Sequence, residues 1–275
     1  MTAAVSRIAH GELELYNPLS AAALDQAIDR LDLAPGARAL DVACGTGAAL
    51  RRIATRWGVR GTGYDRDPHL VERGRLAAPA GVELVVAEEP PAGPFDLVLR
   101  IAASHALGGF PEALERLREL VAPGGQLLLG EGYWRRAPTR EYPDALRGAT
   151  RDELAGYGGL LEAARTAGLV ARWSCAASEH DWDRYEWTQV LNCERWAAEH
   201  AGDPLAEDVR ARAALARHRL ALPGGRETLG FALLLLRRPS RPRRGEPRPR
   251  DLRIPSAHGP ERCHARRASA ARRQR

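Results

Sequence analysis

Two patterns of apolar residues alternate along the first half of the chain. Short continuous apolar runs indicate buried strands, and apolar residues recurring every three or four positions indicate amphipathic helices. The runs predict strands at residues 37–44, 61–65, 82–88, 95–102 and 126–130. The spaced pattern predicts helices around residues 24–31, 50–57, 68–78 and 114–121. Strands that alternate with helices are typical of a doubly wound, mostly parallel α/β sheet.

The second half of the chain is less regular. Thr150 with Glu153, and Asp183 with Glu186, have the spacing of capping boxes, so we predict helices from 150 to about 167 and from 183 to about 200. A further helix is predicted at 204–222 and two more strands at 170–177 and 228–236. The helices between the last two strands form an insertion at about 181–222, where we expect substrate contacts.

The composition changes sharply after residue 238. Residues 239–275 hold 12 arginines against three acids, a net +9, and six prolines, whereas residues 1–238 hold 29 arginines against 32 acids, a net −3. The final segment has almost no large apolar side chains to offset the entropy of folding. We therefore predict one domain at 1–238 and a disordered Arg/Pro-rich tail at 239–275. The tail is either a solvated extension or a contact for nucleic acid.

Charge and cysteine content exclude several classes of protein. The net charge of +6 would suggest a nucleic-acid partner, but it belongs to the tail. The longest apolar run, 231–236, is too short to span a membrane, and the first residues lack a secretory pattern. The four cysteines form no C-x-x-C pair, which argues against a zinc site or a disulfide framework. We predict a cytoplasmic protein without a metal or a membrane partner.

A glycine-containing turn carries the clearest chemistry. It reads Asp41-Val42-Ala43-Cys44-Gly45-Thr46-Gly47 and follows the first predicted strand, where open α/β sheets bind ligands. Glycines allow the backbone to approach a ligand closely, and the next helix begins with unpaired amides at the same place. Asp65 ends the second strand, where a carboxylate can accept both hydroxyls of a ribose.

These residues distinguish between nucleotide ligands. A nicotinamide or flavin site normally has a third glycine near position 50, which is Leu50 here, and its pyrophosphate would meet the unfavourable charge of Asp41. Asp41 and Asp65 together suit a ligand that carries a positive amino acid part and a ribose. S-adenosyl-L-methionine (SAM) is such a ligand.

The whole set of motifs resembles class I SAM-dependent methyltransferases over about residues 18–238. Residues 41–47 are similar to the first motif of that family, although the family usually has glycine where Ala43 stands. The resemblance implies a seven-stranded Rossmann-like sheet, with Asp65 on the ribose and Glu88 near the adenine. The cofactor-binding residues that it implies are Asp41, Cys44, Gly45, Gly47, Asp65, Arg66, Glu88, Arg100 and Ile101.

A narrower resemblance connects the chain with an uncharacterised bacterial subgroup related to YjhP. It rests on Asn17-Pro18 and on residues 130–134, 181–186 and 196–199. This resemblance supports the fold and the cofactor, but it names no methyl acceptor.

Methyl transfer requires alignment of the acceptor and exclusion of water, and a neutral acceptor can also need a base. We predict that His105 or Glu131 serves as the base or orients the acceptor, although His105 also fits a plain loop histidine. Tyr16 and Asn17 can close over the cofactor. The predicted substrate contacts are Asn17, Ser104, Tyr133, Trp134, Trp182 and Tyr185. Tryptophans at helical spacing are also common in cores, so that alternative stays open.

The sequence favours a methyltransferase that acts on a small molecule. One alternative is an RNA methyltransferase that uses the tail as a tether, although residues 100–103 do not form the Asn-Pro-Pro-Tyr-like motif of amino methylation. A second alternative is a SAM-binding regulatory protein without catalysis. The sequence leaves the acceptor atom and the oligomeric state undetermined.

Overall fold

The computed structural model describes residues 2–11, 13–103, 106–146 and 150–240. Beyond Ser240, the predicted tail lies outside the described residues, and so do Ser104 and His105. No helix within these ranges is both long enough and apolar enough to cross a membrane.

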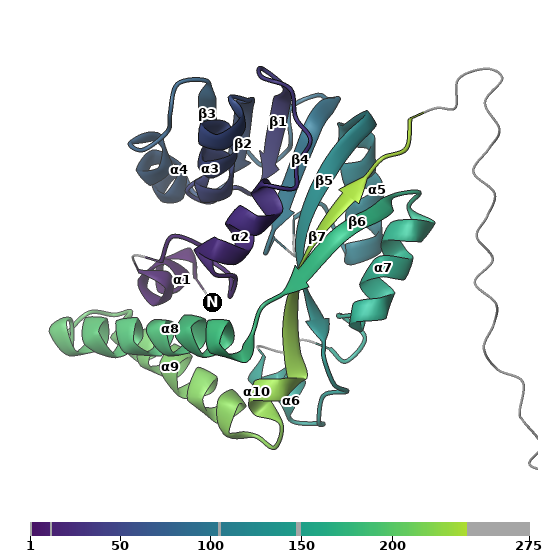
Figure 1. The fold of residues 1–275 in the computed structure, drawn as a ribbon. Helices are drawn as coiled ribbons and strands as arrows, with labels where there is room; N and C mark the ends of the chain where they lie inside the picture. Colours follow the sequence, from purple (N-terminus) through teal and green to yellow (C-terminus); the bar gives the residue numbers. More distant parts are fainter. Residues whose placement is uncertain (1, 12, 104–105, 147–149, 241–275) are drawn as a thin grey trace, which may run out of the picture. The chain divides into compact units, whose positions relative to one another are not determined.

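A seven-stranded sheet in the order β3-β2-β1-β4-β5-β7-β6 forms the centre of the fold (Figure 1). The strands are β1 (Arg38–Val42), β2 (Arg60–Asp65), β3 (Val82–Val86), β4 (Phe95–Ile101), β5 (Val121–Trp134), β6 (Val170–Ala176) and β7 (Leu229–Arg237). The strands β3, β2, β1, β4 and β5 pair in parallel, whereas β7 is antiparallel to both of its neighbours. The predicted doubly wound, mostly parallel sheet of seven strands is confirmed.

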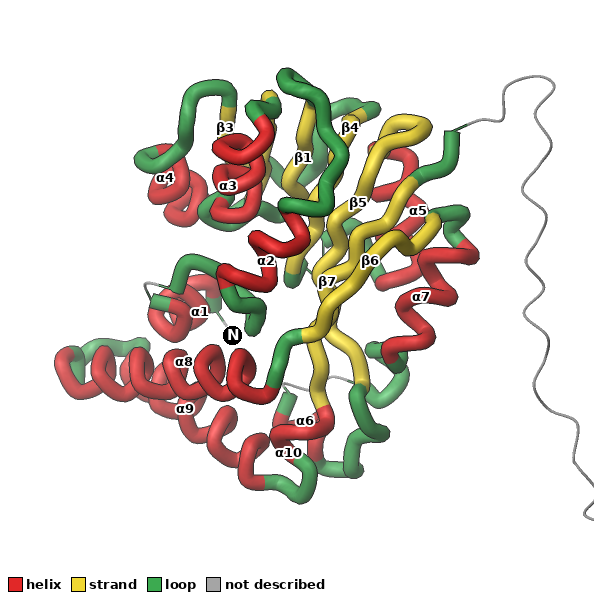
Figure 2. Tube along the Cα trace, in the orientation of Figure 1, coloured by secondary structure: helices red, strands yellow, loops and turns green. Residues whose placement is uncertain are grey.

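Helices cover both faces of this sheet, as the red and yellow segments of Figure 2 show. The helices are α1 (Ala3–His10), α2 (Ala21–Ile28), α3 (Ala48–Trp57), α4 (Pro68–Arg75), α5 (Phe110–Leu120), α6 (Tyr142–Ala145), α7 (Tyr157–Thr166), α8 (Glu179–Glu199), α9 (Ala206–Ala221) and α10 (Gly225–Thr228). Residues of α2 and α3 pack with Leu97 and Leu99 of β4, whereas residues of α5 and α7 pack with Val98. This alternation along β4 is the period of two expected for a strand buried on both faces.

A third apolar cluster joins α1 to the insertion. Val5 and Ala9 of α1 pack with residues of α8 and α9, and Figure 1 shows α1 beside α8. The sequence reading did not predict α1. A helix of eight residues is marginal by itself, and the packing against α8 and α9 supplies its stability.

The first predicted capping box does not start a helix. Glu153 accepts a hydrogen bond from the amide of Thr150 at 3.2 Å, but α7 begins only at Tyr157. The amide of Trp134 donates to the carbonyl of Ala155, and Gly156 forms a bridge with Trp134. This pairing with the end of β5 requires extended backbone, so a helix from residue 150 onward is wrong.

The second predicted capping box is also displaced. The helix α8 begins at Glu179 and is capped by Ser178, whose hydroxyl accepts from the amide of Asp181 at 3.1 Å. Asp181 in turn accepts from the amide of Ser178 at 3.0 Å, which completes the box one turn earlier than predicted. The carboxylate of Asp183 instead pairs with Arg226 of α10.

The strand β5 is longer than predicted at both ends. The predicted strand began at residue 126, whereas β5 begins at Val121 and has an irregularity in its register with β4. At the other end, pairing with β7 continues the strand to Trp134. Glu131 therefore lies within the strand and not at its end.

Close packing brings α4 against the glycine turn. A Cβ atom at Gly74 would lie 2.4 Å from the carbonyl oxygen of Thr46 and 2.6 Å from Leu84 Cδ1. Such distances require the turn backbone to shift. Gly158 in α7 offers a contrast, because no heavy atom lies within 4 Å of its Cβ position.

We predict that Gly74→Ala and Gly158→Ala change stability in opposite directions. Alanine normally stabilises a helix by up to about 1 kcal/mol relative to glycine, which is the direction expected at 158. At 74 the overpacking should dominate and destabilise by about 1–3 kcal/mol. Urea unfolding of both variants measures this difference, and a stabilised Gly74→Ala protein would contradict the packing argument.

Candidate functional site

The turn after β1 adopts left-handed backbone at three positions. The φ angles are 51° at Ala43, 55° at Gly45 and 67° at Gly47. A Cβ atom at Gly45 would have only Leu70 Cδ1 nearby, at 4.0 Å, so this side of the turn is open to a ligand. A Cβ atom at Gly47 would lie 2.8 Å from Leu84 Cδ2, so this glycine is required by packing.

Asp65 is fixed by two backbone amides at the end of β2. Its Oδ2 accepts from the amide of Gly45 at 2.8 Å, and its Oδ1 accepts from the amide of Asp67 at 2.9 Å. Asp67 caps α4 and forms an ion pair with Arg7 of α1 at 2.6 Å. The carboxylate of Asp65 is thereby held across the glycine turn.

Asp41 lies beneath the same turn and is buried. Burial, reinforced by the nearby charge of Asp65, raises the pKa of Asp41 to about 8, and a hydrogen bond from the Leu50 amide only partly opposes this. Burial also raises the pKa of the Cys44 thiol, so this thiol stays protonated at neutral pH. A buried carboxyl beside a second carboxylate favours a ligand that brings positive charge.

A pocket of about 1000 Å³ opens over these groups. Its lining includes seven of the nine predicted cofactor residues, namely Asp41, Cys44, Gly45, Asp65, Arg66, Glu88 and Ile101. Gly47 begins α3 just behind the lining, and the side chain of Arg100 is fully buried. The chain before α2 also contributes Thr2, Ala3, Ser6, Arg7, Glu14, Leu15, Tyr16, Asn17 and Leu19.

The sequence reading found only part of this N-terminal wall. Tyr16 and Asn17 were predicted to close over the cofactor, and both line the pocket. Arg7 was missed because α1 was not predicted, and Glu14, in the irregular stretch after α1, was missed as well. The spacing of Val5 and Ala9, four residues apart, was the signal in the sequence for this helix.

Arg100 and Glu131 form a buried ion pair between β4 and β5. Arg100 Nη1 lies 2.8 Å from Glu131 Oε2, and Arg100 Nε donates to the carbonyl of Ala103 at 3.0 Å. Neither residue lines the pocket. The sequence predicted only a catalytic or orienting role for Glu131, and this pair gives it a structural role. A role for Glu131 as base stays a prediction, and His105 lies outside the described residues.

The predicted aromatic contacts are divided between core and insertion. Tyr133 and Trp134 are buried, and Trp134 Nε1 donates to the carbonyl of Arg151 at 2.8 Å. Trp182 packs edge-on against Tyr185, whose hydroxyl donates to the carbonyl of Tyr16 at 3.2 Å. None of these four lines the pocket, and Tyr185 contacts the pocket lining at Tyr16. Ser104 lies outside the described residues.

The comparison with protein families agrees with this geometry. The family model described as "Methyltransferase domain" matches residues 16–185. The chain belongs to this methyltransferase family. It is a SAM-dependent methyltransferase of class I, because solved relatives with the same fold contain S-adenosyl-L-homocysteine, the demethylated form of SAM.

Three relatives are similar over most of this methyltransferase. YjhP of Escherichia coli, an uncharacterised protein, is 30% identical over 241 residues, which cover 83% of this chain and 96% of YjhP. Two SAM-dependent methyltransferases have solved structures in complex with S-adenosyl-L-homocysteine. The Geobacter sulfurreducens structure has a TM-score of 0.79 and 26% identity and covers 88% of this chain and 99% of its own. The Thiobacillus denitrificans structure has a TM-score of 0.75 and 29% identity and covers 84% and 96%.

The residues of this methyltransferase fit SAM. The open side of Gly45 admits close approach of a ligand, and the carboxylate of Asp65 is part of the pocket lining. The buried Asp41 matches a ligand with ammonium and sulfonium groups. Within the described ranges, no group of three or more histidines, cysteines or acids could hold a metal ion.

We predict that SAM binding releases about one proton near pH 7. With a pKa of about 8, Asp41 is mostly protonated in the free protein at this pH, and a cationic ligand favours its ionised form. Affinity should therefore rise between pH 6 and pH 8. Titration calorimetry in two buffers with different ionisation enthalpies measures the proton release.

Asp41→Asn provides the control and a readout without ligand. The folded protein holds this proton to higher pH than the unfolded chain does, so the Asp41 carboxyl lowers stability as pH rises from about 4 to about 8. The melting temperature of the free Asp41→Asn protein should exceed that of the parent increasingly over this range. An unchanged difference with pH, or undiminished proton release, would contradict the assignment.

Proposed function

We propose that this methyltransferase acts on a small acceptor that is neutral or positively charged. The charge of the pocket carries this proposal. Four acidic residues besides the protonated Asp41 line the pocket, namely Glu14, Asp65, Asp67 and Glu88, and only two arginines do, namely Arg7 and Arg66. A polyanionic nucleic acid would be repelled from such a surface.

The volume supports the same conclusion. About 1000 Å³ is at the upper end of the range for small-molecule pockets, which suits a cofactor and a small acceptor side by side. SAM supplies a methyl group on a sulfonium to the nucleophilic atom of the acceptor. The chain's own residues bind and orient both molecules, and residues 13–19 shield the pocket from water.

Residues after β4 are proposed to contact the acceptor. Ala102 and Ala103 line the pocket, and Ala102 has a left-handed φ of 59° that turns the chain at the end of the strand. Ser104 and His105 follow directly in the sequence. We assign His105 as the base or orienting group, and Asn17 of the pocket lining as an acceptor contact.

Partners and location follow from the same proposal. The small acceptor is the proposed partner, and the cytoplasm is the proposed location. The tail at 239–275 is proposed to be dispensable for binding and transfer. A tethering role for RNA is the outcome that would overturn this.

A methyl-transfer screen with labelled SAM tests the acceptor class. We expect transfer to neutral or cationic metabolites, and none to RNA, by the full chain and by a chain ending at Ser240. That end point retains Arg238, whose guanidinium donates to the carbonyls of Arg118 and Val121. Transfer to RNA that vanishes with the tail would contradict the proposal, and binding of SAM without transfer to any pool would indicate a regulatory protein.

His105→Ala tests the base on the acceptor found by that screen. General acid–base catalysis contributes roughly 10²–10⁴-fold, so kcat should fall by that order while the affinity for SAM is retained. The pH profile of kcat should lose its acidic limb. Unchanged turnover would eliminate the role of His105.

A further inference from the structure

One wall of the cofactor pocket has no regular secondary structure. Residues 13–19 lie between α1 and α2 outside any helix or strand, yet Glu14, Leu15, Tyr16, Asn17 and Leu19 all line the pocket. We call residues 13–19 the wall segment. Its shape therefore depends on side-chain contacts from other elements.

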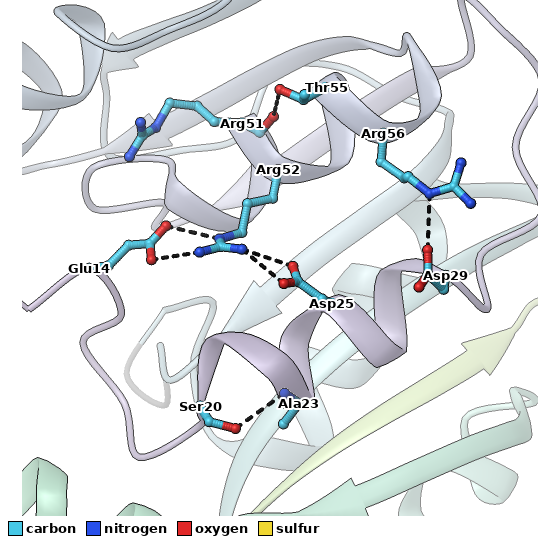
Figure 3. Close-up of polar contacts among 9 residues, drawn as sticks. All are labelled: Glu14, Ser20, Ala23, Asp25, Asp29, Arg51, Arg52, Thr55 and Arg56. Carbon is cyan, nitrogen blue, oxygen red and sulfur yellow. Dashed lines mark hydrogen bonds and ion pairs between the residues drawn. The ribbon is translucent and has the colours of Figure 1, made fainter.

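Arg52 of α3 makes the most extensive of these contacts. Its Nε and Nη2 donate to the two carboxylate oxygens of Glu14 at 2.9 and 2.8 Å. Its Nη1 donates to both oxygens of Asp25 in α2, at 2.9 and 3.1 Å. Figure 3 shows the single guanidinium lying between the two carboxylates, one from the wall segment and one from α2.

The position of Arg52 on α3 connects these contacts to the glycine turn. Arg52 lies one helical turn after Ala48 and so shares its face of α3. Ala48 and Ala49 line the pocket directly after the turn. The bidentate pair with Glu14 thus fastens the wall segment to the helix that begins at the cofactor site. Arg52 also holds the pKa of Glu14 below its usual range, as a direct partner does.

We propose that Arg52 is a positioning residue that holds the wall segment in the shape that binds SAM. This inference rests on the cofactor site and is independent of the acceptor proposed above. Arg52 does not itself line the pocket and acts through Glu14. It is therefore not a catalytic residue.

The energetic effect should be local. Exposed ion pairs contribute little to global stability, and about half of the Glu14 side chain is exposed. Tyr185 and Arg184 of α8 hold the carbonyls of Tyr16 and Leu19, further along the wall segment. The stretch around Glu14 has few backbone hydrogen bonds of its own, so it opens at low free energy once the contact with Arg52 is lost. The affinity for SAM then falls in proportion to the fraction of molecules in which the wall segment keeps its SAM-binding shape.

The chain offers a matched control in Arg56. It lies one turn further along α3 and pairs at 3.0 Å with Asp29, the C-cap residue of α2, and Figure 3 shows Arg56 away from Glu14. Arg52→Ala and Arg56→Ala both remove an exposed arginine that ties α3 to α2. Only the first releases Glu14.

The test combines calorimetry with S-adenosyl-L-homocysteine and hydrogen exchange of the free protein. Arg52→Ala should weaken binding by about tenfold, which corresponds to about 1.4 kcal/mol. It should also speed the exchange of amides in the wall segment. Arg56→Ala should leave the affinity and the exchange rates of the wall segment within about twofold of the parent. The two variants should have similar melting temperatures.

Further variants separate the two carboxylates. Glu14→Gln should reproduce much of the loss, and adding it to Arg52→Ala should cost little more, because both remove the same contact. Asp25→Asn should retain affinity. Arg52→Lys should recover part of it, since an ammonium keeps the charge but not the bidentate geometry.

Two results would overturn the inference. One is Arg52→Ala binding as tightly as the parent with unchanged exchange in the wall segment. The other is an equal loss in Arg56→Ala or in Asp25→Asn, which would assign the effect to the α2–α3 contact. Failure of the parent to bind at all would instead contradict the cofactor site, and failure of transfer alone would concern only the acceptor.

Discussion

The close packing of the glycine turn is the constraint on which the rest of the site depends. The turn adopts left-handed backbone, and two glycines of neighbouring elements make room for it. A Cβ atom at Gly63 of β2 would lie 2.9 Å from Cys44 Sγ, and one at Gly74 of α4 would lie 2.4 Å from the carbonyl of Thr46. With the backbone so enclosed, the amide of Gly45 can hold Asp65 and the open side of the turn can face a ligand. Interiors packed this closely transmit small displacements, so the shape of the pocket follows from these contacts.

The charges of the pocket also favour a particular class of ligand. Burial raises the pKa of Asp41, and the nearby charge of Asp65 raises it further. Ionisation of both carboxyl groups is unfavourable in the free protein, and a cation bound beside them makes it favourable. The acidic groups that attract a positively charged cofactor are thus already in place in the free protein. The same excess of carboxylates favours neutral or cationic acceptors over polyanions.

The helical insertion acts on the pocket through the N-terminal chain. The helix α1 packs on α8 and α9, and the hydroxyl of Tyr185 lies 2.9 Å from Nε2 of His10, whose ring stacks on Tyr16. On the other side, Arg7 reaches Asp67 of α4. The N-terminal residues are therefore held between the insertion and the cofactor-binding half of the sheet. The aromatic residues of α8 support the wall and do not form it.

The sequence by itself determined the seven strands apart from the ends of β5, the helices α2 to α5, the glycine turn and Asp65. These features follow from local periodicity and from backbone conformations that few residues adopt, so neighbouring positions carry the signal. Only the tertiary structure decided where α1 packs, which capping box starts α8, and that Glu131 pairs with Arg100 and Arg52 with Glu14. A carboxylate or a guanidinium has the same sequence signature whether it faces water, a substrate or a partner from a distant strand. Its role is set by which elements the folded sheet brings together, and that choice is made by packing across the whole domain.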